Sequence, residues 1–542
     1  MPTLNWIGKE AVVNHHLQVP FHLLKDVPEL ACGDPGSGNL IVQGDNLVAL
    51  KALLPYYAGQ GKCISVDPPY NTGNDTAEGK GWVYNDNVNS PLIREWLGKA
   101  VGKEGETLDR HDRWLCMMYP RLALLRHFLR EDGAIFISMD DNEVFNLQLM
   151  ANEVFGEHNF VIDLAWHKRV SPANDAKYFS SDHDHILVYA KNKANWRPNR
   201  VPRSEEQLEY YKNPDNDPRG IWNSAAYTCA KTAEARPNLY YPILNPTTGE
   251  EIWPSKTRVW AYDRARHERN VSEGLLYWGK DGRATMPRIK KFLGGRDVVP
   301  RSIWTHSESG HNQEASLEFR DLFPGAEFNN PKPTRLIERV LHVASGPGDL
   351  VLDSFAGSGT TGHAVLKVNY TAKEKEPRRF ILVEMEPSIA RGITAERVRR
   401  VAQGYTNAKG EKVEGLGSGF RFCELGEPLF DEAGKIRETV TFSDIARHVY
   451  FTETGEPLPR QRVTKSPFIG ECRGVGIYLL YNGILGDKTA NGGNVLTRAV
   501  LAQLPPFKGP KVIYCTGCLL GRDRLQAERI IVRQTPYEIK VA

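Results

Sequence analysis

The sequence predicts an α/β protein: a doubly wound, Rossmann-like sheet with an inserted, mostly β domain and a small C-terminal α/β domain. Short apolar runs at residues 64–66, 350–352 and 380–383 have the length of buried strands. Polar or glycine-rich turns end the runs and helical patterns separate them, which is the order of crossover connections between parallel strands. Between the first two runs, residues 195–304 differ in composition from the rest of the chain, which indicates an insertion.

Length and composition limit the classes of protein that the chain can belong to. At 542 residues the chain is too long for one hydrophobic core, and its net charge of +3 restricts any contact with nucleic acid to local patches. No apolar run approaches the length that spans a bilayer and no signal-peptide order is present, so a cytoplasmic protein without membrane contact is expected. The single Cys-x-x-Cys, Cys515 and Cys518, has no second pair, so no metal site is expected.

Shifts in composition along the chain predict its domain organisation. The expected segments are an N-terminal extension (1–30), a first core half (31–194), the insertion (195–325), a second core half (326–403), a Gly/Lys/Glu-rich linker (404–419) and the C-terminal domain (420–542).

Apolar spacing predicts the elements of the first core half. Apolar residues at helical spacing indicate a helix over 108–130, and an Asp-Gly turn ends it. Strands are expected at 134–138, 160–166 and 185–190. The stretch 72–107 is rich in Gly, Asn and charge, and is expected to be a long mobile loop that closes over a bound base or cofactor.

The insertion combines tryptophans with basic charge. Residues 195–304 hold six of the eleven tryptophans, and 19 Lys and Arg against 13 Asp and Glu. Basic and aromatic side chains suit phosphate contact and base stacking. Most of the individual rings are nevertheless interpreted as the core of a small domain, so the basic surplus is the better indication of DNA contact.

The tail alternates strand and helix patterns. Strands are expected at 476–481, 511–515 and 530–534, and helices at 495–504 and 522–529. A dimer contact, a partner contact and an additional DNA contact all remain open as its role.

Asp67-Pro68-Pro69-Tyr70 directly follows the first apolar run. In an open α/β sheet, ligands bind beyond the carboxyl ends of the strands. The two prolines donate no backbone hydrogen bonds, so the Pro68 carbonyl and the Asp67 carboxylate form two acceptors beside the Tyr70 ring. This combination suits a planar group that bears an NH2, such as adenine or cytosine.

A glycine-rich turn follows the second apolar run. Its glycines permit close backbone approach to a ligand, and an acid at the tip of the next strand can accept ribose hydroxyls. The candidate cofactor residues are Asp353, Phe355, Ala356, Gly357, Ser358, Gly359, Thr360 and Glu384. The pattern also fits a dinucleotide fingerprint, whereas the P-loop lysine is absent, so a nucleoside cofactor is predicted without its identity.

The two motifs together resemble the amino-methyltransferases that act on DNA bases with S-adenosylmethionine. The order, with the base motif first, resembles their β group. The resemblance implies S-adenosylmethionine as cofactor and double-stranded DNA as substrate. It also implies that Asp45 contacts the amino group of the cofactor's adenine with Asn46 beside it, and that the segment containing Lys332 and Pro333 closes over the cofactor.

Asn71-Thr72-Gly73-Asn74 and the C-terminal part resemble the modification subunits of type III restriction–modification systems. This narrower resemblance implies a role in restriction–modification or phage defence, a homodimer, a helicase–nuclease restriction subunit as possible partner, and target recognition by the insertion.

The expected reaction is methyl transfer to the N6 amine of adenine. Asp67 and the Pro68 carbonyl accept the two amine hydrogens, Tyr70 stacks on the flipped base, and Pro69 stiffens the turn. N4-methylation of cytosine, a nicotinamide-dependent oxidoreductase and a DNA-binding specificity subunit with lapsed activity are the alternatives.

Overall fold

A computed structural model describes residues 3–72 and 110–535, apart from 175, 204, 295–296, 374, 460–465 and 482–492. The chain forms two compact units, one made of Met1–Asn199 with Arg301–Ala542 and the other of Arg200–Pro300. The expected loop at 72–107 lies almost wholly outside the described residues.

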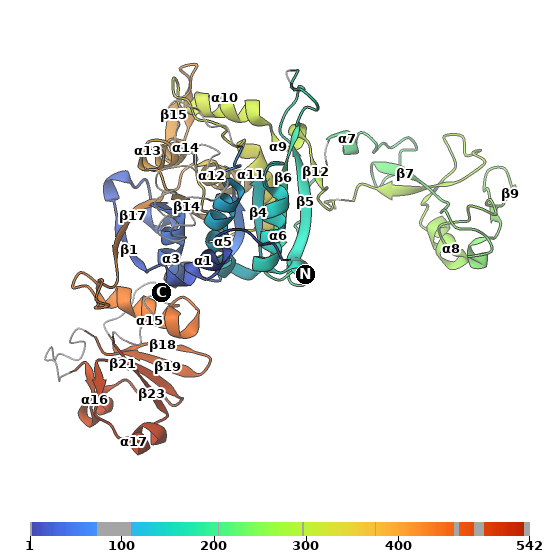
Figure 1. Ribbon diagram of the computed structural model, residues 1–542. Helices are drawn as coiled ribbons and strands as arrows, with labels where there is room; N and C mark the ends of the chain where they lie inside the picture. The colour runs from blue at the N-terminus through green and yellow to red at the C-terminus, as the bar shows by residue number, and fades with distance from the viewer. Residues whose placement is uncertain are drawn as a thin grey trace. The chain divides into compact units, whose positions relative to one another are not determined.

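The first unit is built on a ten-stranded sheet (Figure 1). Its strands, in spatial order, are β1 (His22–Asp26), β17 (Arg421–Pro428), β2 (Leu40–Gln43), β14 (Arg379–Glu384), β13 (Leu350–Asp353), β3 (Gly61–Val66), β4 (Leu129–Met139), β6 (His183–Ala190), β5 (Phe160–His167) and β12 (Ile303–Trp304). From β17 to β4 all neighbours are parallel, and β6 runs antiparallel to both β4 and β5. The predicted doubly wound, largely parallel sheet is confirmed.

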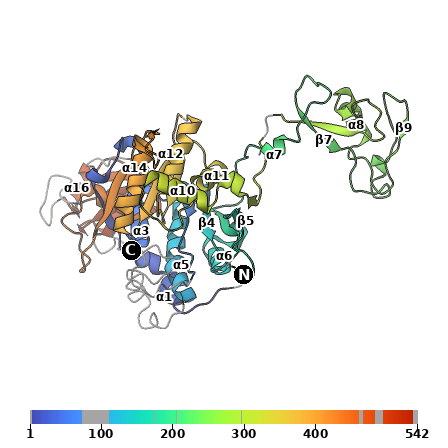
Figure 2. The same ribbon diagram turned by 90° about the horizontal axis from the view of Figure 1, so that it is seen from above.

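Helices cover both faces of the sheet. Figure 2 shows α3 (Asn46–Tyr57), α5 (Arg110–Phe128) and α6 (Val144–Phe155) on one side, and α11 (Thr334–Ala344), α12 (Thr360–Ala372) and α14 (Glu396–Gln403) on the other. The predicted helix at 108–130 corresponds to α5, whose Trp114, Leu115, Met118, Leu122 and Leu125 are buried. The central strands are almost fully buried and aliphatic, as strands covered on both faces must be.

Further helices complete this unit around the sheet. They are α1 (Lys9–Val13), α2 (His15–Gln18), α9 (His306–Ser309), α10 (Asn312–Leu322) and α13 (Pro387–Ile389). Because β12, α9 and α10 contribute to this unit, the insertion ends near residue 300 and not at 325. Among the described residues, no helix combines the length and the apolar character that a bilayer crossing requires.

The Arg200–Pro300 unit has a small sheet and an aromatic core. The sheet runs β10 (Leu276–Tyr277), β11 (Arg288–Phe292) and β7 (Trp222–Ala226), accompanied by a hairpin of β8 (Ile243–Leu244) and β9 (Glu251–Ile252) and by helices α7 (Glu205–Leu208) and α8 (Arg264–Ser272). Its core contains Tyr227, Tyr241, Trp260 and Trp278. Of the six tryptophans in 195–304, Trp222, Trp260 and Trp278 are buried in this unit and Trp253 is half exposed. Trp196 and Trp304 are also buried, but they belong to the first unit, so the interpretation as core of the small domain holds for three of the six rings.

The expected boundaries at residues 30 and 420 are corrected by the main sheet. β17 pairs with β2 in parallel, and β1 pairs antiparallel with β17, so both termini of the core extend the same sheet. β17 buries the adjacent residues Phe422 and Cys423, whose side chains point to opposite faces of the sheet. The expected linker at 404–419 contains a hairpin of β15 (Gly404–Thr406) and β16 (Lys412–Glu414).

The remaining tail forms a small α/β layer. Its sheet runs β18 (Phe468–Cys472), β19 (Val475–Leu479), β21 (Lys511–Cys515) and β23 (Ile530–Gln534), with α15 (Phe442–Thr454), α16 (Arg498–Gln503), α17 (Arg522–Ala527) and the pair β20 (Val495–Leu496) and β22 (Gly517–Cys518). The predicted helix at 495–504 starts later than expected, because its first residues pair as β20 and Thr497 caps α16.

Candidate active site

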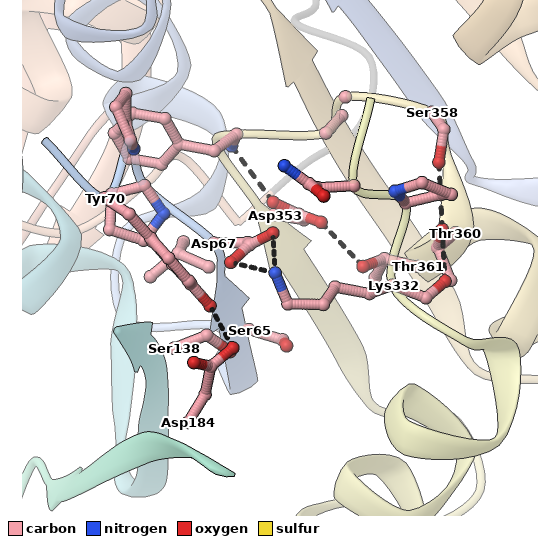
Figure 3. A pocket seen from close by; sticks show the side chains of 18 of the residues that line it. Ser65, Asp67, Tyr70, Ser138, Asp184, Lys332, Asp353, Ser358, Thr360 and Thr361 are labelled. Atoms are coloured by element: carbon pink, nitrogen blue, oxygen red, sulfur yellow. Dashed lines mark hydrogen bonds and ion pairs between the residues drawn. The ribbon is translucent and has the colours of Figure 1, made fainter. Parts of the chain in front are cut away.

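The base motif and the glycine turn meet at one edge of the main sheet. β3 and β13 are adjacent and parallel, with Ile64 opposite Leu352, so the residues that follow each strand leave the sheet side by side. One cavity is lined by residues of both segments and by the segment 328–332 (Figure 3). Two parts of the chain nearly 300 residues apart therefore share one pocket.

Most of the predicted site residues line this cavity. Those that do are Asp67, Pro68, Pro69, Tyr70, Lys332, Asp353, Phe355, Ala356, Gly357, Ser358 and Thr360. Those that do not are Asp45, Asn46, Pro333, Gly359 and Glu384. In the second group, Glu384 and Asn46 hydrogen-bond to the backbone of the glycine turn or of the residue before it, and Asp45 caps α3.

A lysine occupies the space between the base-motif carboxylate and its aromatic ring. Lys332 Nζ lies 2.8 and 2.6 Å from the two carboxylate oxygens of Asp67, and 4.7 Å from the centroid of the Tyr70 ring (Figure 3). The segment that carries Lys332 is fixed by α11, which starts two residues later, and by Thr360 Oγ1, which donates to the Lys332 carbonyl. The pocket therefore already holds a nitrogen cation against the predicted acceptor.

The Tyr70 ring is positioned from the neighbouring hairpin. Its hydroxyl donates to Asp184 at 3.3 Å, and Lys168 Nζ contacts the other oxygen of Asp184 at 2.5 Å. Burial, followed by the charges of Asp184 and Asp67, raises the pKa of Tyr70 well above its usual value, so the phenol remains a donor. The Trp114 indole donates to the Pro69 carbonyl at 2.7 Å and fixes the turn.

Sequence reasoning missed Lys168, Asp184 and Asp140, which also line the cavity. In the sequence they are ordinary charges at strand ends. The register of the β5–β6 hairpin, with Trp166 opposite Asp184, brings Lys168 and Asp184 to this edge of the sheet. Asp140 reaches it because it directly follows β4, which runs parallel to β3.

Asp353 ends β13 inside the cavity wall. Its two oxygens accept hydrogen bonds from the Phe355 N–H at 3.0 Å and from Thr361 Oγ1 at 2.6 Å. Burial raises the pKa of Asp353 to about 7, and the charge of Asp67 adds to the increase. This carboxyl therefore changes its ionisation near neutral pH.

The glycine turn is held from behind by Glu384. This side chain is fully buried, and its oxygens accept the Gly357 and Glu386 N–H groups, each at 2.9 Å. Gly359 has a φ of +79°, and a Cβ there would lie 3.0 Å from the Thr394 carbonyl oxygen, so the turn requires glycine. The structure thus gives Glu384 a supporting contact, and its direct contact with a ribose stays a prediction.

Asp45 and Asn46 also act on the pocket indirectly. Asp45 caps α3 through the Leu47 and Val48 N–H groups and pairs with buried Arg121 at 2.8 Å. Asn46 donates to the Ser354 carbonyl at 3.1 Å, directly before the glycine turn. Their predicted contact with the cofactor stays a prediction.

Among the described residues of the cavity wall, acidic groups outnumber basic groups. The carboxyls are Asp67, Asp140, Asp184 and Asp353, and the cations are Lys168 and Lys332. Burial also raises the pKa of Asp140. Such a pocket favours a ligand that carries positive charge, or a reaction in which positive charge develops.

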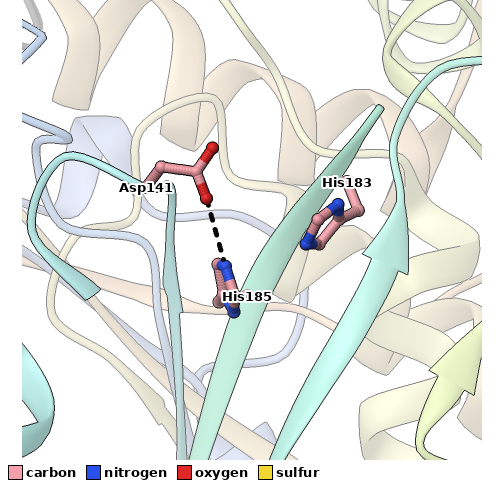
Figure 4. A group of neighbouring side chains, drawn as sticks. All are labelled: Asp141, His183 and His185. Carbon is pink, nitrogen blue, oxygen red and sulfur yellow. Dashed lines mark hydrogen bonds and ion pairs between the residues drawn. The ribbon is translucent and has the colours of Figure 1, made fainter. Parts of the chain in front are cut away.

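A second group of titratable side chains lies on the turn after β4 and on β6 (Figure 4). The candidate ligand atoms of Asp141, His183 and His185 lie within 4.8 Å of one another. His185 Nδ1 lies 2.8 Å from Asp163 and its Nε2 lies 3.3 Å from Asp141, and the Asp163 hydrogen bond is the main cause of its raised pKa. Two carboxylates therefore already engage both ring nitrogens, and the prediction that the chain has no metal site stays a prediction.

Comparison with known proteins identifies what the chain is similar to. The family model described as DNA methylase matches residues 62–396. The Mod subunit of the type III restriction-modification enzyme StyLTI from Salmonella typhimurium is 35% identical over 371 residues, covering 67% of this chain and 54% of the relative. The EcoPI Mod subunit of Escherichia phage P1 is 32% identical over 431 residues, covering 71% of this chain and 64% of the relative.

The EcoP15I Mod subunit of Escherichia coli is 31% identical over 440 residues, again covering 71% of this chain and 64% of the relative. The chain thus matches between 54% and 64% of the length of these three relatives. The matched family region spans both halves of the pocket, from β3 to the start of α14.

Proposed function

The chain belongs to the DNA methylase family, and from this premise we propose that it transfers a methyl group from S-adenosylmethionine to the N6 amine of adenine in duplex DNA. The observation that carries the proposal is the pocket itself. The carboxylate of Asp67, the ring of Tyr70 and the backbone of the glycine turn line one cavity. An amine acceptor, a stacking surface and a nucleoside-type turn are the three parts that such a transfer needs.

The position of Lys332 supports the assignment of the base half. Its ammonium lies within 2.8 Å of both Asp67 oxygens and over the Tyr70 ring. An exocyclic NH2 of a base stacked on Tyr70 would donate to the same oxygens. The target amine therefore replaces the Lys332 ammonium when a flipped base enters, and the pocket never exposes an unpaired Asp67 carboxylate.

The Asp67 carboxylate then makes the amine reactive. It accepts one amine hydrogen and the Pro68 carbonyl accepts the other, which draws the nitrogen lone pair out of conjugation with the ring. As the nitrogen–carbon bond forms and the sulfur–carbon bond breaks, positive charge develops on nitrogen beside a fixed carboxylate. The nitrogen finally gives up one proton through the hydrogen bond to Asp67.

The cofactor half fits S-adenosylmethionine. When bound, this cofactor supplies a methyl group on a positively charged sulfur, and the acidic excess of the cavity wall complements that charge. We assign its binding to Phe355, Ala356, Gly357, Ser358 and Thr360, with the Asp353 carboxyl beside them in the cavity wall. Glu384, Asn46 and Asp45 hold this turn in place through the Gly357 N–H, the Ser354 carbonyl and α3.

We assign target recognition to the Arg200–Pro300 unit. The interval 195–304 has 19 basic against 13 acidic residues, and Trp253 is 50% exposed beside Tyr240, with ring centroids 5.1 Å apart. Exposed rings among cations suit contact with DNA. The relatives are named Mod subunits of type III restriction-modification enzymes, so we further propose a homodimer that works with a helicase–nuclease restriction subunit in the cytoplasm.

The test is to map modified bases in a bacterial host without other DNA methyltransferases, with and without this protein. We expect N6-methyladenine at one short recurring sequence, identified by nucleoside mass after digestion. The Asp67→Ala variant is the matched control and should leave the DNA unmodified. N4-methylcytosine would replace the proposed substrate, and DNA binding without any modified base would contradict the proposed activity.

A further inference from the structure

The connection between β5 and β6 starts and ends at the pocket. Lys168, directly after β5, and Asp184, near the start of β6, both line the cavity. β5 runs parallel to β3 and β4, so its end lies at the same sheet edge as the base motif. Figure 1 shows this connection extending beyond the ends of the two strands. Whatever binds across the mouth of the pocket therefore meets it.

The connection is held by its own hydrogen bonds. Lys168 N–H donates to the Asp182 carbonyl at 2.9 Å, which continues the hairpin beyond the strands. Further out, the Ala173 N–H donates to Ser180 Oγ at 2.7 Å, and Ser180 contacts the Asp182 carboxylate. Residues 173 and 180 are thus tied together, so the tip between them is presented from a defined base.

Two adjacent aromatic side chains stand exposed at this tip. Tyr178 is 82% exposed and Phe179 is 94% exposed, and Lys177 Nζ lies 5.3 Å from the centroid of the Tyr178 ring. Arg169 is a second exposed cation of the same connection. Single exposed apolar residues are ordinary, but two neighbouring rings on a tied loop beside a pocket indicate a binding surface.

We propose that this tip enters the DNA duplex at the place that the target base leaves. The inference rests on the proposed function, because only a flipped base opens such a gap. The Phe179 ring stacks on the bases that flank the gap, Tyr178 packs beside it, and Arg169 and Lys177 contact the phosphates. Apolar side chains inserted between base steps are an established way to hold a distorted duplex.

Duplex DNA is the occupant that the geometry favours. A base in the pocket must remain attached to its duplex, so the helix has to lie across the sheet edge from which the tip projects. Flipping breaks stacking on both sides of the base, and an aromatic ring restores part of it. Cations beside the rings match the charge of the backbone.

The test compares methylation of two synthetic duplexes that contain the mapped target sequence. In one the target adenine is paired, and in the other it lies opposite an abasic position, so that flipping is already easy. Phe179→Ala should methylate the paired duplex about tenfold to a hundredfold more slowly than the parent protein, and Tyr178→Ala less so. On the abasic duplex both variants should approach the parent rate.

The matched control is Tyr370→Ala. Tyr370 is 59% exposed near the end of α12, about ten residues along the helix from the glycine turn, and its removal should leave both rates unchanged. Cofactor binding by calorimetry should be equal in all variants.

Three results would overturn the proposal. They are parent-like methylation of the paired duplex by Phe179→Ala, an equal loss on both duplexes, and a change in the native mass of the variant, which would assign the tip to a protein contact. A parent protein that methylates neither duplex would instead contradict the proposed function, independently of the tip.

Discussion

The two halves of the pocket hold their acidic groups in different ways. In the base half, Asp67 and Asp184 are paired with the ammonium groups of Lys332 and Lys168, which lie on flexible side chains. In the cofactor half, Asp353 and Glu384 are held mainly by backbone N–H groups and by a buried hydroxyl. Side-chain cations can be exchanged for a ligand, whereas backbone donors stay in place.

This difference indicates how the work is divided. Under the proposed mechanism the base half exchanges one partner for another in each reaction cycle, so substitutions there should affect catalysis. The cofactor half is part of the folded frame, so its changes should affect stability and cofactor binding. Each of the following predictions separates the two halves or shows that they are coupled.

The largest effect is expected in the pH dependence of stability, from Asp353. Its pKa is about 7 in the folded protein against 3.8 as the ordinary value. The unfolded chain loses this proton first, so stability is full below about pH 4, falls as the pH rises towards 7, and is level above it. The free energy of unfolding falls in total by about 4 kcal/mol, because each pKa unit between the unfolded and folded values contributes 1.36 kcal/mol.

Asp353→Asn should remove this slope, because the amide keeps an acceptor for Phe355 and cannot ionise. The measurement is urea unfolding of both proteins between pH 5 and 8. Parallel pH profiles for the two proteins would show that Asp353 is not the group responsible.

The next effect concerns Asp67. Asp67→Asn preserves the shape of the turn but removes the charge that faces the reacting amine. We expect methyl transfer to fall by about 10²–10³-fold, while cofactor affinity measured by calorimetry stays near that of the parent. A variant that methylates DNA at the parent rate would exclude the proposed role of the carboxylate.

Glu384 should show the opposite behaviour. Glu384→Ala leaves the Gly357 and Glu386 N–H groups without their acceptor inside the protein, which costs about 2 kcal/mol of stability and weakens cofactor binding. Glu384→Gln retains one acceptor oxygen, so its stability and cofactor affinity should lie between those of the parent protein and those of Glu384→Ala. Thermal unfolding and calorimetry measure both quantities, and a stable Ala variant with unchanged affinity would contradict the supporting role.

The smallest effect is expected at Tyr70. Tyr70→Phe keeps the ring and loses only the 3.3 Å hydrogen bond to Asp184, so kcat/KM for DNA should change less than about fivefold. Tyr70→Ala removes the stacking surface and should lower kcat/KM by about tenfold or more. Equal losses of kcat/KM in Tyr70→Phe and Tyr70→Ala would assign the role to the hydroxyl and not to the ring.

Sequence reasoning located the pocket because both motifs follow buried strands. Apolar runs before Asp67 and before the glycine turn identified β3 and β13, and parallel strands leave a sheet at the same edge. The same reasoning gave Asp45 and Glu384 direct ligand contacts. It could not foresee that Arg121 and the Gly357 N–H already engage them, since those contacts depend on packing across α5 and the turn.

Strand pairing between distant parts of the chain explains the other differences between the expected and the observed structure. Lys168 and Asp184 entered the site through hairpin register, which no local pattern in the sequence reveals. β17 joins the main sheet beside β2 although about 380 residues separate them, so the expected boundary at 420 was misplaced. The aromatic core of the Arg200–Pro300 unit was foreseen from its few aliphatic residues, whereas the end of that unit near residue 300 was not.

The central claim is that the base motif and the glycine turn hold the two reactants in one crevice. The most direct measurement is a crystal structure with sinefungin, a cofactor analogue that carries an amine where the transferred methyl group would be. The account predicts that its nucleoside contacts residues 353–360 and that its amine points towards Asp67, into the space beside the Tyr70 ring. An analogue bound elsewhere, or with its amine directed away from Asp67, would contradict the claim.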